Sequence, residues 1–416
     1  MSCEEWAVGP FGLNGPAGGT LDCQRTVLVV VHHLTAASRL ADIVPWLECD
    51  RRVQVVFTWG PGSLAPVMPS GVREFLRRLE GVVLPWQQAA QLRFDLAVAA
   101  ARPSLERLHA PVLTVSHGIG YGKYAVGWPG PGARAPREVF GLERSTLVHR
   151  GRVVASAIAV PTQRMLERLA RACPEAAPAA FVAGDPCYDR LVASAGSRDA
   201  YRRGLGVGDR RLVAVSSTWG PGSLLRQYPE MLSRLTAELP AGEFRVAAII
   251  HPGVWSWYGR RQVRAWFADA IDGGLLLVPP EEGWRGVLAA ADVLVGDHGS
   301  VTSYAAAIGI PVLLAGSSAG QVEPGSLQAD VARRAPALCP QKPWAQQLDE
   351  AADRWHAQAH AAIRERVSDL PGQSAQILRT AMYRLMSLAE PADPPVVRPV
   401  PVPEPLETLM TFGGSR

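Results

Sequence analysis

Short apolar runs rich in Val, Ile and Leu recur along the chain and are separated by segments with helical spacing. The runs alternate little between apolar and polar positions, which indicates strands buried on both faces, as in parallel α/β sheets. Helical segments such as 70–81 and 161–173 supply the crossovers. The predicted strands are residues 26–31, 53–57, 81–85, 94–100, 111–115 and 153–160 in the first half, and 211–217, 244–250, 274–279, 292–296 and 310–316 in the second.

Polar or glycine-rich segments follow many of these predicted strands. Ligands of doubly wound sheets bind outside the carboxyl ends of the strands, so we expect the functional residues there. The pattern predicts an α/β protein with two Rossmann-type, doubly wound parallel-sheet domains that face a cleft. The segments are HHLTAAS (32–38), TWGPGS (58–63), SHGIGYGK (116–123), TWGPGS (218–223), HPGVWSW (251–257), PPEEGW (279–284) and GDHGSVTS (296–303).

The length of 416 residues is about twice the size at which one hydrophobic core stops growing, which also predicts two domains. The helical segment around 343–389 is assigned to the second domain, and its return to the first is left open. The predicted division is a flexible N-terminus (1–20), an N-terminal Rossmann-like domain (21–181), a linker (182–210), a C-terminal Rossmann-like domain (211–390) and a Pro-rich disordered tail (391–416).

The heptapeptide TWGPGSL occurs twice, at 58–64 and at 218–224. Each copy follows a predicted strand, and the sequences that follow the two copies differ completely. A solenoid would require a sustained repeat, and a recent duplication would require similar flanks. We therefore interpret the copies as the same strand-to-helix turn used once in each half, with its serine suited to capping the next helix.

Composition and charge restrict the class of protein further. The net charge is +4 without a basic cluster, which argues against nucleic-acid binding. The six cysteines form no C-x-x-C pair, which argues against a zinc site or a disulfide framework. No apolar run approaches the roughly 20 residues that span a bilayer, and the first residues lack the pattern of a signal peptide. We expect a cytoplasmic protein.

A turn of small residues at 296–303 joins a predicted strand to a helical segment that begins with hydroxyl side chains. Free N–H groups and the helix dipole at such a turn favour a phosphate. The alternative is that Ser300 or Ser303 only caps the helix.

Histidines at strand ends are candidate catalytic residues. Pro252 fixes His251 at the end of an apolar strand, where its imidazole could contact a phosphate, although a structural role is the alternative. His117 lies in the loop 116–123, and its pKa range is that of a general base near neutral pH.

The glycines of the loop 116–123 permit close approach of a ligand. Lys123 could reach a phosphate or lie exposed in solvent. His32 and His33, which follow the first strand, are interpreted as residues that position their loop.

Five segments form an ordered set of motifs, namely residues 115–124, 182–191, 217–223, 249–254 and 290–314. In sequence and order they resemble the CDP-glycerol glycerophosphotransferase family, the teichoic-acid primases and polymerases of GT-B fold. The resemblance spans roughly residues 110–320. The family's aromatic residue after the aspartate of the turn is replaced here by His298, and its Thr-Pro pair is replaced by Ile119-Gly120.

The resemblance implies a GT-B fold with an N-terminal acceptor domain and a C-terminal nucleotide-donor domain. It makes His117 the base that deprotonates an acceptor hydroxyl, and His251 the contact to the pyrophosphate of the donor. Ser300 and Thr302, with the backbone amides of their turn, would bind the same phosphates, and Thr218 and Trp219 would border the nucleotide. The implied donor and phosphate site comprises Gly118, Lys123, Thr218, Trp219, Gly220, Asp297, Gly299, Ser300, Val301 and Thr302.

We therefore predict transfer of a glycerophosphate-like or glycosyl group from a nucleotide-diphosphate donor, CDP-glycerol-like in first place, to a hydroxyl acceptor. No metal site or cofactor is predicted, and an Mg²⁺ that accompanies the nucleotide is left open. The alternatives are a UDP- or dTDP-sugar glycosyltransferase, a UDP-sugar 2-epimerase and a catalytically silent GT-B-like binding protein. The sequence suggests neither a transmembrane segment nor a basic or aromatic membrane-targeting helix, and it leaves peripheral membrane contact and the oligomeric state open.

Overall fold

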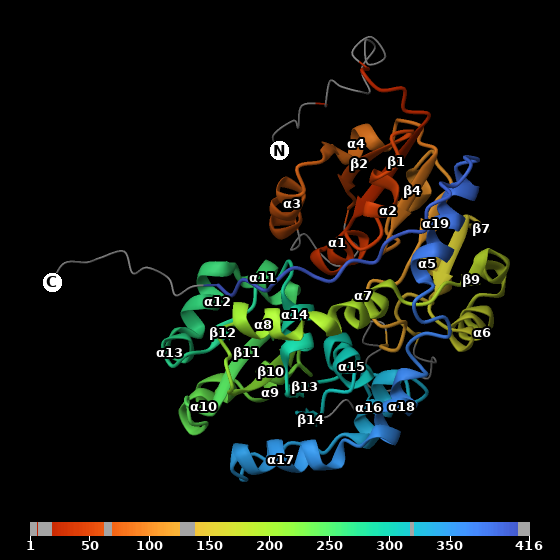
Figure 1. Ribbon diagram of the computed structural model, residues 1–416. Helices are drawn as coiled ribbons and strands as arrows, with labels where there is room; N and C mark the ends of the chain where they lie inside the picture. Colours follow the sequence, from red (N-terminus) through yellow and green to blue (C-terminus); the bar gives the residue numbers. More distant parts are fainter. Residues whose placement is uncertain (1–5, 7–18, 62–68, 125–137, 317–319, 407–416) are drawn as a thin grey trace. The chain divides into compact units, whose positions relative to one another are not determined.

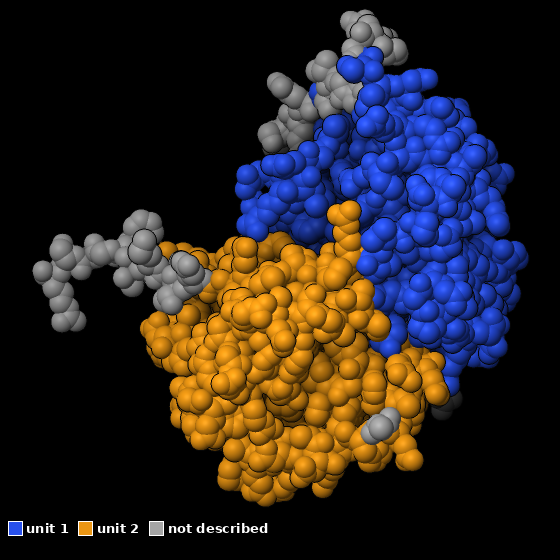
Figure 2. All heavy atoms as spheres, viewed as in Figure 1, with its two compact units in different colours: residues 1–189, 368–397 blue, residues 190–367, 398–416 orange. Residues whose placement is uncertain are grey.

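The computed structural model describes residues 6, 19–61, 69–124, 138–316 and 320–406. The chain forms two compact units, each built from two separate stretches of sequence (Figure 2). Unit 1 comprises Met1–Asp189 and Ser368–Val397, and unit 2 comprises Arg190–Val367 and Arg398–Arg416. Each unit has its own parallel sheet, so the predicted α/β class with two Rossmann-type domains is confirmed.

Unit 1 is built on a seven-stranded parallel sheet in the order β3-β2-β1-β4-β5-β8-β9 (Figure 1). The chain starts at β1, moves outward to β3 and returns to β4 on the other side of β1. The topological switch point, where ligands of such sheets bind, therefore lies between β1 and β4. The strands are β1 (Arg25–Val31), β2 (Val53–Trp59), β3 (Val82–Leu84), β4 (Leu96–Ala99), β5 (Val112–Thr114), β8 (Ala157–Val160) and β9 (Ala180–Val182), with a separate antiparallel pair of β6 (Val148–His149) and β7 (Arg152–Val153).

Unit 2 is built on a five-stranded parallel sheet in the order β12-β11-β10-β13-β14. Its switch point lies between β10 and β13, for the same topological reason. Its strands are β10 (Arg211–Ser217), β11 (Phe244–Ile250), β12 (Leu276–Leu277), β13 (Val293–Gly296) and β14 (Val312–Leu314).

Helices connect the strands in both units (Figure 1). Hydroxyl caps mark some of their starts: the Thr162 oxygen accepts from the Met165 amide at α6, at 3.1 Å. The helices of unit 1 are α1 (Leu34–Leu40), α2 (Pro45–Glu48), α3 (Pro69–Arg78), α4 (Trp86–Ala89), α5 (Arg144–Leu147), α6 (Gln163–Ala172) and α19 (Ser374–Leu385), and α7 (Pro186–Ser194) crosses from unit 1 to unit 2. Those of unit 2 are α8 (Arg198–Gly204), α9 (Leu224–Gln227), α10 (Met231–Glu238), α11 (Pro252–Tyr258), α12 (Arg260–Trp266), α13 (Ala268–Asp272), α14 (Trp284–Ala290), α15 (Ser300–Ala307), α16 (Leu327–Arg334), α17 (Trp344–Arg354) and α18 (Ala357–Arg364); the 3-10 turns are Leu105–Arg107, Pro174–Ala179 and Ala195–Ser197.

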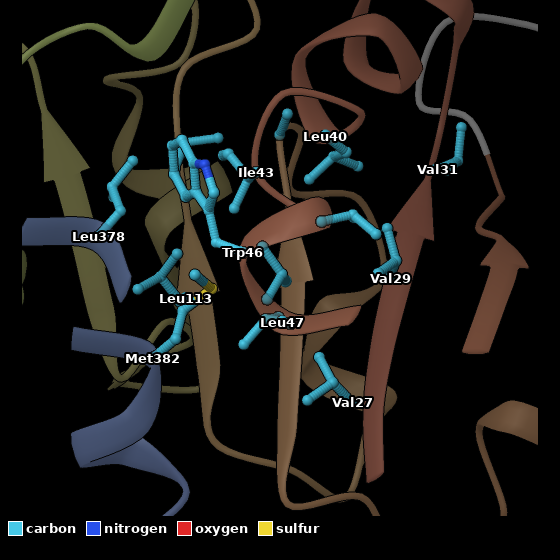
Figure 3. Packing of buried hydrophobic residues seen from close by; sticks show 14 of the residues in the cluster. Val27, Val29, Val31, Leu40, Ile43, Trp46, Leu47, Leu113, Leu378 and Met382 are labelled. Carbon is cyan, nitrogen blue, oxygen red and sulfur yellow. The ribbon is translucent and has the colours of Figure 1, made fainter. Parts of the chain in front are cut away.

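The C-terminal helix α19 completes the core of unit 1, although the sequence assigned it to the second domain. Leu378 and Met382 of α19 are fully buried in one cluster with Trp46 and Leu113 (Figure 3). The Asp189 carboxylate fixes the start of the helix, since it accepts from the Gly372 amide at 2.7 Å and the Ser374 amide at 3.1 Å. The return of the chain to the first domain, which the sequence left open, is therefore the observed arrangement.

The predicted linker, 182–210, is an ordered part of both units. It contains the end of β9, then α7, a 3-10 turn and α8. Strand β9 itself was not predicted, because Ala180–Val182 follow a stretch rich in alanine and proline and form no apolar β-branched run. The predicted strand at 153–160 is interrupted, and only Ala157–Val160 joins the sheet as β8.

The Pro-rich segment 391–406 is ordered, so the prediction of disorder from residue 391 requires correction over this range. Proline removes backbone donors, but the free carbonyls of the segment accept from side chains. Trp46 Nε1 donates to the carbonyl of Val396 at 3.3 Å within unit 1, and the Tyr201 hydroxyl donates to the carbonyl of Val400 at 2.8 Å within unit 2. The Leu406 amide then donates to the carbonyl of Leu277 on the edge strand β12 at 2.8 Å.

Candidate functional site

The buried carboxylate of Asp297 joins the two loops at the switch point of unit 2. It is 1% exposed and follows β13 directly. Its oxygens accept from the Thr218 amide at 2.7 Å, the Thr218 hydroxyl at 2.8 Å and the Leu224 amide at 2.9 Å, all on the loop after β10. They also accept from the Gly299 amide at 3.0 Å on its own loop. Asp297 and Thr218, both predicted to contact the donor, thus hold the two loops together.

The N-terminus of α15 follows the Asp297 turn. Gly299 occupies the N-cap position, and no described side chain caps the helix. A Cβ atom at Gly299 would lie 2.8 Å from Thr218 Cγ2 and 3.2 Å from Asp297 Oδ1, so this close approach of the loops requires glycine. The first-turn residues Ser300 and Val301 are partly exposed, which leaves the positive end of the helix accessible to an anion.

The side chains of Thr302 and Ser303, the next hydroxyl residues after Ser300, are buried in the protein. Thr302 is 1% exposed and packs against Gly296, and its Oγ1 has no hydrogen-bond partner among the described residues. The buried Ser303 Oγ donates to the Gly299 carbonyl at 3.3 Å. Any phosphate contact at this turn would therefore come from Ser300 and from backbone amides, and the predicted contact by the Thr302 hydroxyl is not available in this arrangement.

His251 directly follows strand β11 and caps α11. Its Nδ1 accepts from the Gly253 amide at 2.9 Å. In a neutral imidazole one nitrogen accepts and the other carries the proton, so this hydrogen bond places the proton of His251 on Nε2. The N–H group at Nε2 is a donor, which is the property that a phosphate oxygen requires.

Trp219 stacks beside His251, with ring centroids 6.1 Å apart and an interplanar angle of 27°. It is 40% exposed, which is unusual for a tryptophan next to a buried loop. Gly220, the next residue, has a φ of +88°, so the chain reverses there in a conformation that favours glycine. A partly exposed indole ring beside a hydrogen-bond donor for phosphate, the His251 Nε2–H, is suited to stacking on a flat ring such as a nucleobase.

The two TWGPGSL copies differ in role where both can be compared. In the second copy, Ser223 occupies the N-cap position of α9 as predicted, although without a side-chain hydrogen bond. In the first copy, Thr58 is fully buried and Trp59 lies under the Arg73 guanidinium, 5.0 Å from the ring centroid. These contacts give Thr58 and Trp59 of the first copy a structural role; residues 62–64 of that copy lie outside the described ranges.

His117 belongs to unit 1, in the loop after β5. Its Nδ1 lies 3.1 Å from the carbonyl oxygen of Ala100, which can only accept, so Nδ1 carries the proton and Nε2 keeps a lone pair. Burial lowers the pKa of His117 to about 4, and the nearby charges of Arg39, Arg102 and Lys123 act in the same direction. The expectation of a pKa near neutrality is therefore wrong in this arrangement. At neutral pH the imidazole is uncharged, and it can accept a proton at Nε2 only as a weaker base than an ordinary histidine.

The rings of His33 and Phe140 hold the His117 imidazole from two sides. Both contact it edge-on, with centroid distances of 4.8 Å and 5.8 Å. His33 caps α1 through Nδ1, which accepts from the Ala36 amide at 3.1 Å. His32 is buried, and its Nε2 donates to the carbonyl of Pro103 at 2.9 Å. The interpretation of these two histidines as positioning residues fits this geometry.

A buried ion pair supports the loop of His117 and was not predicted. Arg39 and Asp185 are 3% and 2% exposed, with 2.7 Å between Arg39 NH1 and Asp185 Oδ1. Arg39 NH2 also reaches the carbonyl of Gly118 at 3.4 Å, and Asp185 accepts from the Cys187 and Tyr188 amides. Asp185 belongs to a motif of the resemblance, but Arg39 lies on α1 in no motif, so nothing in the sequence indicated the pair.

Gly118 and Lys123, the remaining predicted residues of unit 1, belong to the same loop as His117. Gly118 is partly buried and accepts from the Ser116 hydroxyl at 3.0 Å. The carbonyl of Lys123 accepts from the Phe140 amide at 2.8 Å, and the Lys123 side chain is partly buried.

A metal centre and a membrane span were not predicted. No group of three or more His, Cys, Asp or Glu side chains suited to a metal ion occurs within the described residues. None of the helices in the described ranges has the length and apolar character required to cross a bilayer.

The chain has the fold of the wall teichoic acid polymerase TagF. A TagF variant with CDPG superposes with a TM-score of 0.58 at 13% sequence identity, over 88% of this chain and 90% of that chain. TagF itself gives a TM-score of 0.57 at 13% identity, over 88% and 90%. MnaA of S. aureus, in a co-structure with UDP, gives 0.51 at 12% identity, over 89% and 99%. No protein-family model and no curated protein matches the chain. The predicted GT-B fold is therefore confirmed.

Proposed function

We propose that the protein is a transferase that moves a glycerophosphate group from a CDP-glycerol-like donor to a hydroxyl acceptor. The observation that carries the proposal is a group of hydrogen-bond donors and one exposed aromatic ring on the loops that follow the strands of unit 2. The N-terminus of α15, the Nε2–H of His251 and the exposed face of Trp219 together suit two phosphates and a base. The similarity to TagF, whose structure was determined with CDPG, favours a cytidine nucleotide.

In the proposed reaction, the acceptor hydroxyl oxygen attacks the phosphorus atom that carries glycerol. His117 Nε2 takes the hydroxyl proton as the new O–P bond forms. The bond between this phosphorus and the bridging oxygen breaks, and its electron pair leaves with CMP. His251 Nε2–H and the amides of Ser300 and Val301 stabilise the charge on the phosphates, and such preorganised donors are commonly the largest catalytic contribution.

A UDP- or dTDP-sugar donor is the second candidate, because the MnaA co-structure contains UDP on a similar fold. A 2-epimerase would need carboxylates near the reacting sugar. In unit 1, Asp185 is paired with Arg39, which also donates to the carbonyl of Gly118 in the His117 loop. Transfer is therefore preferred to epimerisation.

Nucleotide binding and turnover test the proposal separately. Binding of CDP, UDP and dTDP is measured by calorimetry, and release of CMP or of nucleoside diphosphate from CDP-glycerol, CDP-ribitol and UDP-sugars is measured by chromatography. CDP should bind most tightly, and His251→Ala should weaken it about 10- to 100-fold, the loss expected for a hydrogen bond to a charged group. His149→Ala, at an exposed position of unit 1, is the matched control.

Two results would overturn the proposal. If no nucleotide binds, or if His251→Ala binds CDP as the unaltered protein does, the donor site is wrong. If nucleotides bind but none of the donors is turned over with any hydroxyl acceptor, the chain is a binding protein of GT-B fold.

A further inference from the structure

Two arginine side chains line one small pocket of unit 2, which we call the arginine pocket. Arg210 immediately precedes β10, and Arg245 is the second residue of β11, so the pocket lies where these two strands begin (Figure 1). Both strands are seven residues long, which puts the pocket roughly 20 Å along the sheet from the loops of Trp219 and His251 at the other strand ends. The arginine pocket is therefore separate from the candidate donor site.

The guanidinium of Arg245 has no protein partner within the described ranges. Its Nε is buried, and none of its nitrogens donates a hydrogen bond or forms an ion pair there. Glu243, the nearest acidic residue along the chain, is exposed and does not pair with it. Burial lowers the pKa of Arg245, and the charge of Arg210 acts in the same direction. Arginine remains charged at neutral pH despite such a shift, so Arg245 is a cation that has lost hydration without gaining a counter-ion.

Arg210 supplies a second positive charge, which is held in a fixed position. Its Nε donates to the carbonyl of Val207 at 2.9 Å, its NH1 donates to the carbonyl of Ala241 at 3.4 Å, and its NH2 donates to the carbonyl of Gly206. These acceptors are neutral and leave the charge uncompensated. Asp209, the acidic residue next to it along the chain, is exposed and forms no ion pair with it.

The walls of the pocket limit the size of a ligand. Gly274 has a φ of +97°, and a Cβ atom there would lie 3.0 Å from Arg245 NH1, so the glycine leaves space for the guanidinium. The pocket contains about 280 Å³ of empty space, part of it open to solvent. Pockets for drug-sized ligands typically contain roughly 300–1,000 Å³, so this one suits a smaller molecule.

We propose that Arg210 and Arg245 bind a small phosphate dianion, either inorganic phosphate or a phosphate monoester. Two uncompensated guanidinium groups match the charge of a dianion, and the planar N–H groups of arginine match the spacing of phosphate oxygens. A carboxylate has a single charge and would leave one guanidinium without a counter-ion. This second anion site lies outside the candidate donor site, and the inference does not rest on the proposed function.

The Nε–H signals of the arginine side chains test the site on the full chain. Nitrogen-15 spectra are recorded during titration with inorganic phosphate, methyl phosphate and acetate at constant ionic strength. We expect the Arg245 signal, assigned with Arg245→Gln, to shift with both phosphates and to change little with acetate. The phosphate that binds more tightly shows whether the free or the esterified form is preferred. His251→Ala should leave these shifts unchanged, because His251 belongs to the other end of the sheet.

The contribution of Arg245 to affinity is measured through the signal of Arg210. Arg245→Gln should weaken phosphate binding about 10- to 100-fold, the loss expected for hydrogen bonds to a charged group. Arg261→Gln, at an exposed position on α12, is the matched control and should keep the affinity of the unaltered protein. Thermal unfolding of each variant shows that the fold is kept.

Four results would overturn the inference. The first is the absence of a phosphate-dependent shift at Arg245, and the second is equal phosphate affinity of Arg245→Gln and the unaltered protein. Equal shifts with acetate and phosphate would show a cationic surface without preference for a dianion. Loss of the shift in His251→Ala would show that phosphate acts from the candidate donor site.

Discussion

The two units present their candidate histidines in opposite tautomers. In unit 1 the His117 Nδ1–H donates to the carbonyl of Ala100, which leaves a lone pair on Nε2. In unit 2 the His251 Nδ1 accepts from the Gly253 amide, which leaves a proton on Nε2. A backbone carbonyl partner thus makes Nε2 of one histidine a proton acceptor, and a backbone amide partner makes Nε2 of the other histidine a hydrogen-bond donor. Equivalent positions at the ends of parallel strands therefore do not have equivalent chemistry.

The comparison extends to the buried aspartates beneath the loops. Asp297 is satisfied by three amides and a hydroxyl, and Asp185 is satisfied by two amides and the Arg39 guanidinium. Unit 2 stabilises its carboxylate with neutral donors, whereas unit 1 requires a buried cation. The loop of His117 should therefore be the more sensitive to the loss of one side chain.

The largest effect expected is on turnover by His117→Ala. Removal of a general base costs about 10²- to 10⁴-fold in rate, and CDP affinity should change less than twofold because His117 is in the other unit from the proposed donor site. Single-turnover kinetics with CDP-glycerol and calorimetry with CDP measure the two quantities. Equal losses in both would show that the two histidines do not have separate roles.

Loss of the Arg39 charge should produce the next largest effect. Arg39→Met leaves Asp185 buried without its cation, and we expect a loss of roughly 3–5 kcal/mol in the free energy of unfolding. The control is Arg144→Met, which breaks the exposed pair with Glu175 and should leave the free energy of unfolding nearly unchanged, because solvent screens this pair. Urea unfolding measures both, and similar values for the two variants would contradict the role given to burial.

Much of the fold could be predicted because it depends on local patterns. The apolar runs locate eleven of the twelve strands of the two sheets within a few residues, and the glycine at 299 and the proline at 252 mark real turns. Strand β9 could not be predicted, because it follows a stretch rich in alanine and proline and forms no apolar β-branched run. The position of α19 could not be predicted either, because it depends on burial of Leu378 and Met382 in a distant core.

The location of the candidate residues at strand ends could be predicted, but their contacts could not. The strand-end residues His117, His251 and Asp297 lie at the ends of parallel strands as expected. The tautomers depend on single backbone contacts, and the direction of the Thr302 hydroxyl depends on how α15 packs on β13, so neither follows from the sequence.

The pH dependence of stability should report on the buried histidines. Burial lowers the pKa of His32 to about 4, below the usual value of 6.5, and the same holds for His117. The unfolded chain then binds more protons between these values, so the free energy of unfolding should fall as the pH is lowered from about 6.5 to 4. His32→Gln should remove roughly 3 kcal/mol of this decrease, whereas His149→Ala should leave it unchanged. A pH-independent stability across this window would refute the assignment.

The smallest effect expected is that of a methyl group at Gly299. The Cβ of Gly299→Ala would press on Thr218 Cγ2, which the hydroxyl bond to Asp297 holds in place, so the loops must separate slightly. We expect a loss of about 1–3 kcal/mol in stability and weaker CDP binding. Gly242→Ala, with no atom within 4 Å of its Cβ, should change neither quantity. Equal behaviour of the two variants would remove the requirement for glycine at the turn.

The nitrogen chemical shifts of the two histidine rings test the central comparison most directly. Long-range proton–nitrogen correlation spectra of histidine-labelled protein, assigned with His117→Ala and His251→Ala, distinguish a protonated from an unprotonated ring nitrogen. At neutral pH the account predicts that His117 is protonated at Nδ1 and His251 at Nε2. The same tautomer in both rings, or a charged His117, would contradict it.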